Sequence, residues 1–595
     1  MITRRRFISI SMMIVALFLL FQGPQIIRER WNQYGINSHA QKTVMTIDRE
    51  WNENETAAGT ALYVGEESSD SYEIVKEWAH YTKRRLIRKD DVSDVLQYKN
   101  MNPDLVIIDE SLWADNDLEH EVEQVLKSGM SVLFTKLPDY ERIDESSLAK
   151  ELLGINEIYE PSVTTDGIHL FSGFFLGGER IYQPLKQQEE SLQDLELTMP
   201  WYRLGQRTET YMMGIIDDDN YLNESMPGVI WSCANGDAKT FAIVGDYFLD
   251  RMIGIGILNA AVAKIQDSYL YPCVNSQQFE IINYPALSNE NKEELQRIYS
   301  RNTTGILRNL ILPGVTADTA ANKFIVSAYI MPQYDYADDN EPIPGELNYY
   351  LRKLGEDNGE ACYSMDHNDT ISLEEKLKKD VEALREAPDY QFTSAFVDFK
   401  ELEESEAALN LYLPDIRTLS TRYSLNYPLI SFLTSGRTLQ TATADVTEYS
   451  YTKDLEQMGA ETALGYANIQ MDLRKVYWPE SEEDQWQNAS RNYFSVIDTY
   501  WKPYSAFEHT TASLADQRAR NLLTLSYEVL ENNDELTVLC SDFCESAQFI
   551  LRTHNKKVTD VIGGSFQNIE EDAWLISIND TTAHIKLEED MHLGR

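Results

Sequence analysis

Cysteine is scarce in this chain of 595 residues, which holds only five. No C-x-x-C pair occurs, so the sequence gives no basis for a structural zinc ribbon. Cys233 and Cys273 fall in one predicted domain and could form a disulfide, whereas Cys540 and Cys544 are too close in the chain for easy disulfide geometry. No G-x-S-x-G elbow, Walker loop or dinucleotide-binding glycine pattern is present, which removes the usual signatures of those enzyme classes.

Positive charge is also scarce. The chain carries 52 Lys and Arg against 97 Asp and Glu, a formal net charge of -45. Phosphate would repel so acidic a protein, which argues against a nucleic-acid partner. Hydrophobic residues still make up 43 % of the chain, enough for several cores, and the length corresponds to roughly two to four domains.

Long apolar runs are absent except near the N-terminus. Residues 7–27 carry no charge and follow three arginines at 4–6. A helix of about 20 residues spans a bilayer, and arginines before it hold the N-terminus in the cytoplasm. The pattern predicts a single-pass signal anchor in the cell membrane with an extracytoplasmic body. A cleaved signal peptide is the alternative, although no A-x-A site follows the run.

The remaining chain divides into four predicted units behind a stalk. The tip and anchor take residues 1–27, and a polar stalk takes 28–57. From residue 58, short apolar runs such as TALYVG and DLVIIDES alternate with amphipathic helices such as SYEIVKEWAHYTKRR. This alternation predicts an α/β domain with a parallel, doubly wound sheet over 58–285. A helix over 252–265, with Gly and Ala spaced for close packing, ends this half.

The first domain resembles the class I glutamine-amidotransferase-like fold found in extracytoplasmic carbohydrate-associated proteins. Enzymes of that class place a nucleophilic cysteine at a strand-to-helix elbow. Residues 1–232 contain no cysteine. The resemblance therefore implies a binding or scaffolding domain and not a cysteine-dependent amidotransferase.

A connector over 286–320 leads to a second large unit over 321–530. Strand-like runs such as FIVSAYIM, FTSAFVDF and TALGYANIQMD recur there, separated by helical stretches such as EEKLKKDVEALREA. This spacing predicts a β/α barrel with polar residues at the carboxyl ends of its strands. A strand-rich C-terminal region follows over 531–595.

The second unit resembles the NodB-like polysaccharide deacetylase barrel at the acidic loop over 334–339, YDYADD. In that family one aspartate acts as base and another binds the metal, together with two histidines separated by three residues. No two of the nine histidines here are three to five residues apart. Without that metal a bound water keeps its high pKa, so the resemblance implies a degenerate barrel that keeps a sugar-binding groove.

The sequence offers three sets of candidate site residues, of which the catalytic and metal sets share Asp338. The catalytic candidates are Asp335, Asp338 and Glu508. The aromatic candidates for sugar binding are Tyr334, Tyr336, Trp478 and Trp501, for which core packing is the plainer interpretation. No cofactor is expected unless the barrel is active, in which case a divalent ion such as zinc would be bound by Asp338, Asp339, His367 and His509.

Glycoside hydrolysis is a further option. It needs two carboxylates about 5 Å or about 6.5–9.5 Å apart across a cleft, and the chain has many carboxylates near predicted strand ends. Acidic residues follow many of the predicted strands. They are Asp335, Asp338, Asp339, Asp366, Asp398, Asp472 and Glu508. Since the chain has 97 acidic residues, their presence at strand ends does not select a pair.

The order of the units, together with the phrases YPCVN at 271–275 and 331–342, resembles a family of membrane-anchored bacterial proteins with a domain of unknown function associated with Pel-type exopolysaccharide loci. The resemblance implies a protein that binds an exopolysaccharide and assists its assembly, modification or export, with synthase and transporter subunits as partners. A metal-dependent esterase or deacetylase and a glycoside hydrolase are the alternatives. An acidic, aromatic body suits a cationic hexosamine polymer.

Overall fold

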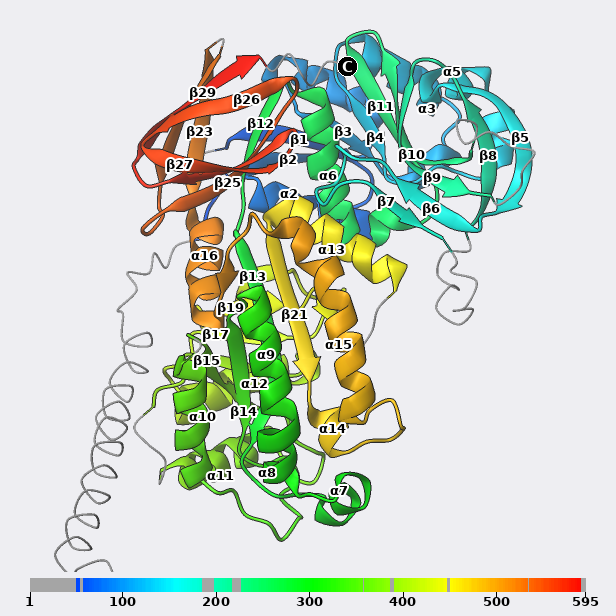
Figure 1. Cartoon of the computed structure of the whole chain (residues 1–595). Coiled ribbons are helices and arrows are strands. Elements are labelled where there is room, and N and C mark those ends of the chain that lie inside the picture. The colour runs from blue at the N-terminus through cyan, green and yellow to red at the C-terminus, as the bar shows by residue number, and fades with distance from the viewer. Residues whose placement is uncertain are drawn as a thin grey trace, which may run out of the picture.

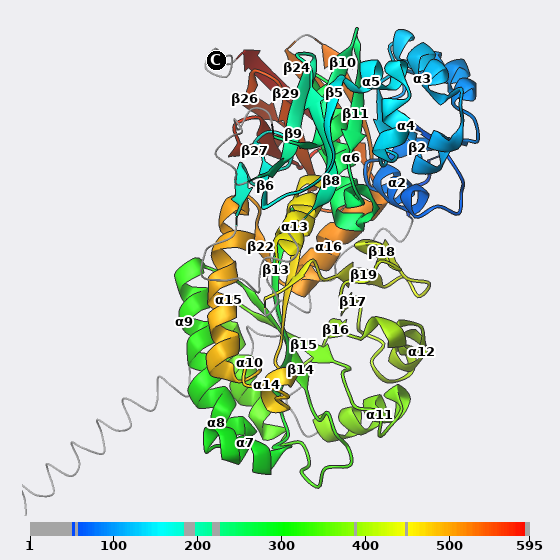
Figure 2. The same ribbon diagram turned by 90° about the vertical axis from the view of Figure 1, so that its right-hand side faces the viewer.

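The computed structural model describes residues 50–53, 57–183, 197–216, 226–356, 358–385, 390–446, 450–532 and 534–589. It consists of two stacked parts, an upper one with the N-terminal and C-terminal sheets and a lower one with a curled parallel sheet (Figures 1 and 2). The predicted anchor over 1–27 and nearly all of the stalk lie outside the described residues. Within the described ranges, no helix combines the length and the apolar character needed to cross a bilayer.

The first part is built on a mixed, doubly wound sheet. Its strands, in spatial order, are β2 (Arg84–Lys89), β1 (Gly59–Val64), β3 (Leu105–Ile108), β4 (Val132–Phe134), β11 (Ala238–Ile243), β10 (Gly228–Asn235), β9 (Thr208–Ile215), β6 (Gly167–Leu170) and β7 (Arg180–Tyr182). The first five are parallel and the rest are antiparallel. The predicted doubly wound α/β domain is thus confirmed, with an antiparallel extension.

Helices and a two-stranded ribbon flank this sheet. The helices are α2 (Asp70–Tyr81), α3 (Leu118–Lys127), α4 (Tyr140–Asp144), α5 (Ser147–Leu153) and α6 (Arg251–Ile265), and the ribbon pairs β5 (Ile155–Thr164) with β8 (Thr198–Leu204). β3 is buried over its whole length because strands flank it on both sides and apolar side chains cover both faces. Cys233 and Cys273 are both free thiols, so they form no disulfide.

The second part is a curled sheet. Its parallel strands run in the order β17 (Thr418–Thr421), β16 (Ser394–Phe396), β15 (Glu360–Ser364), β14 (Val326–Met331), β13 (Ser276–Ala286) and β21 (Tyr466–Asp472). The segment that holds β19 (Thr438–Thr441) and β20 (Ala444–Asp445) pairs with β17 at its start and with β21 at its end. Ala442 N donates to Thr421 O and Thr443 N donates to Asn468 O. One segment therefore meets both edges and curls the sheet back on itself.

Helices surround the curled sheet, and short elements complete it. The helices are α7 (Lys292–Tyr299), α8 (Thr303–Ile306), α9 (Leu312–Asn322), α10 (Gly345–Glu356), α11 (Leu373–Leu384), α12 (Leu402–Tyr412), α13 (Tyr451–Leu464), α14 (Arg474–Tyr477), α15 (Trp486–Tyr500) and α16 (Ala512–Thr524), with β18 (Ile430–Phe432) and β22 (His509–Thr510) as the short strands. The sequence places the start of this unit at residue 321, but β13 already lies near its centre. β13 contains polar residues, so its sequence does not have the apolar pattern of a buried strand. In the structure all of its residues are buried inside the curled sheet.

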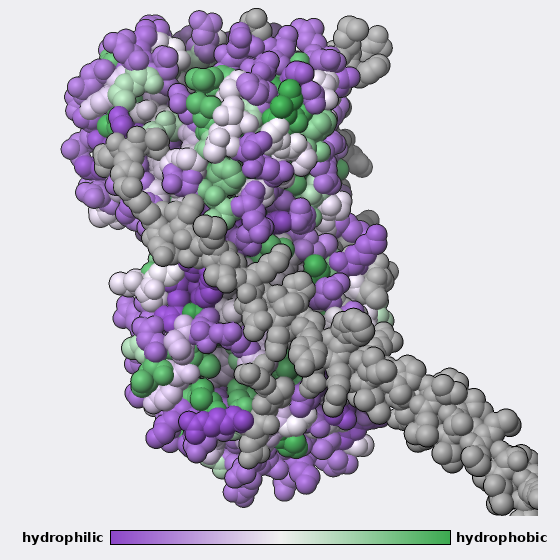
Figure 3. Space-filling model, turned by 90° about the vertical axis from the view of Figure 1, so that its left-hand side faces the viewer, coloured by the Kyte–Doolittle hydropathy of each residue, from purple (hydrophilic) through white to green (hydrophobic). Residues whose placement is uncertain are grey.

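The C-terminal region forms two antiparallel sheets, as its strand-rich sequence predicts. One contains β23 (Ser526–Asn532), β24 (Glu535–Ser541), β29 (Thr582–Glu589) and β26 (Lys556–Ile562), and the other contains β12 (Ser268–Pro272), β25 (Ala547–Thr553), β28 (Ala573–Ile578) and β27 (Gly564–Glu570). β12 comes directly before β13 in the sequence. The second sheet therefore combines strands of the C-terminal region with a strand from the middle of the chain. On the face shown in Figure 3, hydrophobic residues are scattered among hydrophilic ones over the upper part.

The two parts meet where α6 crosses α13. Gly256 and Gly459 lie at the crossing, and a Cβ on Gly459 would stand 2.3 Å from the carbonyl oxygen of Met252. Asn259, which is buried, donates to Ala463 O and accepts from Trp78 Nε1 and Tyr269 OH. The crossing is therefore a close backbone contact, held by three hydrogen bonds of one buried amide.

Replacing Gly459 with alanine should loosen this junction. The added methyl meets backbone, which has no rotamer to escape into, so we expect Gly459→Ala to lower the free energy of unfolding by about 1–3 kcal/mol. Urea unfolding of the full chain measures this. Gly345→Ala is the matched control, because a Cβ there meets nothing within 4 Å; equal stability of the two variants would contradict the prediction.

Candidate functional site

The candidate site lies at the carboxyl ends of the strands of the curled sheet, which we call the mouth. Its residues lie near or just past the carboxyl ends of β13, β15, β16, β17 and β21 and are Asn283, Asp366, Asp398, Arg422, Asp472 and Arg474. The arrow of β21 in Figure 1 points away from the first part, so the mouth is at the far end of the molecule. Catalytic and binding residues of β/α barrels gather at this face because the loops there converge from many strands.

Asn283 links two acidic residues of the mouth. Its Nδ2 donates to Asp366 Oδ2 and to Asp472 Oδ1, each at 2.8 Å, while its Oδ1 accepts from Ser364 Oγ at 2.7 Å. The two carboxylate oxygens are therefore separated by at most twice the hydrogen-bond length. Asn283 has φ of 62°, a left-handed conformation that asparagine tolerates better than most residues.

Two arginines balance the charge of these carboxylates. Guanidinium nitrogens of Arg422 lie 3.0 Å from a carboxylate oxygen of Asp398 and 2.5 Å from one of Asp472. A guanidinium nitrogen of Arg474 lies 3.5 Å from a carboxylate oxygen of Asp366. Burial, followed by the charge of Asp472, raises the pKa of Asp366 above its usual range. Both carboxyl groups have arginine partners, while burial raises the pKa of Asp366.

An aromatic pair borders the same network. The rings of Tyr334 and Trp478 lie with their centroids 4.7 Å apart, and the guanidinium of Arg474 stands over Tyr334 at 5.8 Å. Both aromatic residues are partly exposed. Of the four aromatic candidates in the sequence, these two are brought together at the mouth.

The other candidates in the loop over 334–340 have structural partners. The carboxylate of Asp335 accepts from Ala337 N at 2.9 Å, and that of Asp338 accepts from Asn340 N at 2.8 Å. Tyr336 donates its hydroxyl to Asp380, which is buried on α11. These side chains shape the loop, while Asp339 is exposed.

Glu508, His509 and Trp501 lie at the opposite end of the curled sheet from the mouth. His509 pairs with Gln277 at the start of β13, about 20 Å from Asn283 at a rise of about 3.3 Å per residue. Trp501 is buried in the core beside Phe279 and Phe324.

This separation corrects two sequence-based expectations. His367, which contacts Met365 O and Glu401 at the mouth, cannot share an ion with His509, and Glu508 cannot act with Asp335. Within the described ranges, no three His, Cys, Asp or Glu side chains are grouped to hold a metal. The expectation failed because His509 precedes a helix at the amino end of the sheet, a placement that the sequence spacing does not reveal.

Sequence reasoning missed Asn283, Arg422 and Arg474, although it noted Asp366, Asp398 and Asp472 at strand ends. A signal was present in each case. Asn283 ends the run FEIIN, Arg422 follows TLST, and Arg474 comes two residues after a strand end. Amide and arginine side chains are mostly exposed in proteins, so the sequence alone does not mark these three as site residues.

No protein-family model matches the chain, and no curated protein matches its sequence. Among solved structures, a putative ThuA-like protein from Bacteroides uniformis is 14 % identical with a TM-score of 0.22, over 36 % of this chain and 95 % of that one. A putative GMP synthase component from Thermoplasma acidophilum is 8 % identical with a TM-score of 0.20, over 35 % and 93 %. The cold-adapted β-galactosidase from Rahnella is 12 % identical with a TM-score of 0.23, over 36 % and 34 %. These likenesses are distant and assign no family.

The loop at the mouth should respond to pH through Glu290. This buried side chain accepts from Asp335 N at 2.6 Å and from Tyr334 N at 3.1 Å, and burial raises its pKa to about 7. A carboxyl whose pKa is raised on folding stabilises the fold below its unfolded pKa, which is 4.5 for this group. That contribution is lost as the pH rises through about 7.

We expect Glu290→Gln, which cannot ionise, to lose less stability than the native protein between pH 4.5 and 7, by on the order of 2 kcal/mol. Urea unfolding across this range measures the difference. Glu341→Gln, at an exposed position, should follow the native curve. A Glu290→Gln curve parallel to the native one would refute the assignment.

Proposed function

We propose that this protein is a membrane-anchored, extracytoplasmic protein that binds a cell-surface exopolysaccharide at the mouth of its curled sheet and assists assembly, modification or export of that polymer. The observation that carries the proposal is the aromatic pair Tyr334 and Trp478 beside the network of Asn283, Arg474 and their carboxylates. Residues 7–27 would supply the anchor. Synthase and transporter subunits are the partners that this role requires.

The side chains of the mouth match the surface of a sugar. A sugar ring has an apolar face and a rim of hydroxyl groups, and it needs a flat aromatic surface together with fixed donors and acceptors. Trp478 and Tyr334 supply the surface. Arg422 and Asp398, both about a third exposed or less, supply a donor and an acceptor that can exchange their mutual ion pair for hydroxyl groups.

The acidic character of the chain favours a polymer of positive charge. With 97 acidic against 52 basic residues, the body attracts amine-bearing chains over a distance that salt shortens. A partially deacetylated hexosamine polymer has that charge. Its binding should therefore weaken as the salt concentration rises, and binding indifferent to salt would point to a neutral polymer.

Removing the aromatic surface should weaken polymer binding without unfolding the protein. We expect Trp478→Ala and Tyr334→Ala each to reduce affinity for partially deacetylated hexosamine oligomers at least about tenfold, or about 1.4 kcal/mol. Isothermal titration calorimetry with the full chain measures this. Phe566→Ala, which truncates a partly exposed aromatic residue of the C-terminal sheets, should bind as the native protein does; equal affinity of all three variants would exclude the mouth as the binding site.

Glycoside hydrolysis is a second candidate function, favoured by the two carboxyl groups that share the amide of Asn283. Their closeness fits a retaining hydrolase. Asp366 would give its proton to the glycosidic oxygen as the bond to the anomeric carbon breaks. Asp472 would form a bond to that carbon, and water would later release the sugar. No observation within the described residues favours the metal-dependent deacetylase or esterase that the sequence left open.

The hydrolase candidate predicts reducing ends released from polymer by the native protein. We expect Asp366→Asn and Asp472→Asn each to lower this release by about 10²-fold or more, because the first removes the proton donor and the second removes the nucleophile. A reducing-end assay measures it, with Glu508→Gln at the opposite end of the sheet as control. If the native protein releases none while binding persists, the hydrolase candidate fails and the binding proposal remains.

A further inference from the structure

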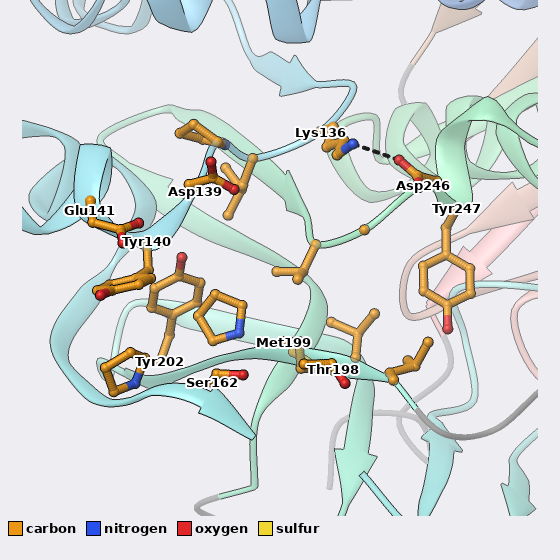
Figure 4. Close-up of a pocket in the computed structure, with 18 of the residues that line it drawn as sticks. Lys136, Asp139, Tyr140, Glu141, Ser162, Thr198, Met199, Tyr202, Asp246 and Tyr247 are labelled. Atoms are coloured by element: carbon orange, nitrogen blue, oxygen red, sulfur yellow. Dashed lines mark hydrogen bonds and ion pairs between the residues drawn. The ribbon is translucent and has the colours of Figure 1, made fainter. Parts of the chain in front are cut away.

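A cavity of about 800 Å³ lies in the first part of the molecule, apart from the mouth. Segments 136–141 and 244–247, which follow β4 and β11, form one side, and the ribbon of β5 and β8 forms another (Figure 4). Ligands of doubly wound sheets bind at the carboxyl edge of the parallel strands, where this cavity opens. Its volume falls within the range of small-molecule sites.

The wall of the cavity carries a buried hydroxyl group that makes no hydrogen bond to the described residues. Tyr202 on β8 is 1 % exposed, and its hydroxyl has no hydrogen-bond partner among the described residues. Figure 4 shows its ring rising from β8 towards segment 139–141. Burial, together with the charges of Asp139 and Glu141, raises the pKa of Tyr202, so the hydroxyl keeps its proton. A buried donor left without a partner is costly, which indicates that a ligand atom completes it.

The charge around the cavity is negative. Asp139, Glu141, Asp246 and Asp250 line it, against a single lysine, Lys136. The ammonium of Lys136 lies 2.6 Å from Asp246 and 3.3 Å from Glu110, so its charge is already balanced. Asp139 and Glu141 remain exposed on the side of the cavity that Tyr202 faces.

A second hollow adjoins the cavity at Lys136, and the charge of its acidic residues is also negative. This hollow shares residues 136–139 and reaches Asp109 and Ser71. Although burial opposes it, hydrogen bonds from Ser111 and Ser71 hold the pKa of Asp109 below its usual range, so this carboxylate is ionised. The whole edge therefore attracts cations and repels anions.

We propose that this cavity binds a sugar-sized ligand that carries a free primary amine. The ammonium group is placed against Asp139 and Glu141, the hydroxyl of Tyr202 hydrogen-bonds to a ring substituent, and the ring packs on Tyr140 and on the apolar floor formed by Met199 and Val229. Aromatic faces favour a nearby cation in addition to the carboxylates. The site is separate from the mouth and does not depend on the function proposed for it.

Glucosamine and N-acetylglucosamine test the proposal, because acetylation removes the charge and keeps the ring. Calorimetry with the full native chain should show glucosamine bound at least about tenfold more tightly than N-acetylglucosamine. Equal binding of both sugars, or no binding of glucosamine at millimolar concentration, would overturn the proposal. This comparison needs no variant and therefore does not depend on how well a variant folds.

Variants then locate the site. The double change Asp139→Asn with Glu141→Gln should weaken glucosamine binding at least about tenfold, whereas Glu145→Gln, on the same short segment but outside the cavity, should not. Tyr202→Phe should raise the melting temperature of the ligand-free protein, since an unpaired buried hydroxyl is removed. It should also reduce the further rise that glucosamine produces.

The two proposals fail separately. Trp478→Ala should leave the affinity of the cavity for glucosamine unchanged. In the background of the double variant of Asp139 and Glu141, Trp478→Ala should still cause its full loss of affinity for hexosamine oligomers. Glucosamine binding that is abolished by Trp478→Ala, or that survives the double variant, would place the amine at the mouth and refute the cavity as its site.

Discussion

The contact between α6 and α13 holds the rest of the structure in place. α6 closes the first part and α13 belongs to the curled sheet, yet Gly256 and Gly459 let their backbones touch. Any side chain at either position would force the helices apart. Asn259 then joins three elements through hydrogen bonds to Trp78, Tyr269 and Ala463. The residues of α13 from Asp454 to Leu464 are buried, so this helix packs tightly where the two parts meet.

The interior of the curled sheet is polar, and this shapes what the mouth can do. Glu280, buried near the middle of β13, accepts from Tyr329, Ser420 and Gln470. Such a network must be satisfied throughout, because a lost partner would leave a buried charge or dipole. The strands are thereby held in register below the mouth, and Asn283 can place two carboxylates within hydrogen-bond reach of one nitrogen. A rigid base is what a binding or catalytic constellation needs.

The sequence predicted much of the fold and part of the site. The alternation of apolar runs and amphipathic helices after residue 58 identified the doubly wound sheet, because burial on both faces gives strands such as LVII a continuous apolar pattern. The same reasoning missed β13, whose Gln, Glu and Asn side chains look like those of a loop but are buried inside the curl. Tyr334 and Trp478 were recognised as a candidate surface, whereas Trp501, of the same type and from the same stretch, is core.

By itself the sequence determined local structure, charge and the inventory of side chains: which segments form strands and helices, the excess of acid over base, and the lack of closely spaced histidines. Tertiary structure alone decided which of those side chains meet. His367 and His509 lie at opposite ends of one sheet, while Asp366 and Asp472, more than a hundred residues apart, share an amide. The physical reason is that local propensity depends on neighbours along the chain, whereas a site depends on strand order and register, which many weak long-range contacts establish together.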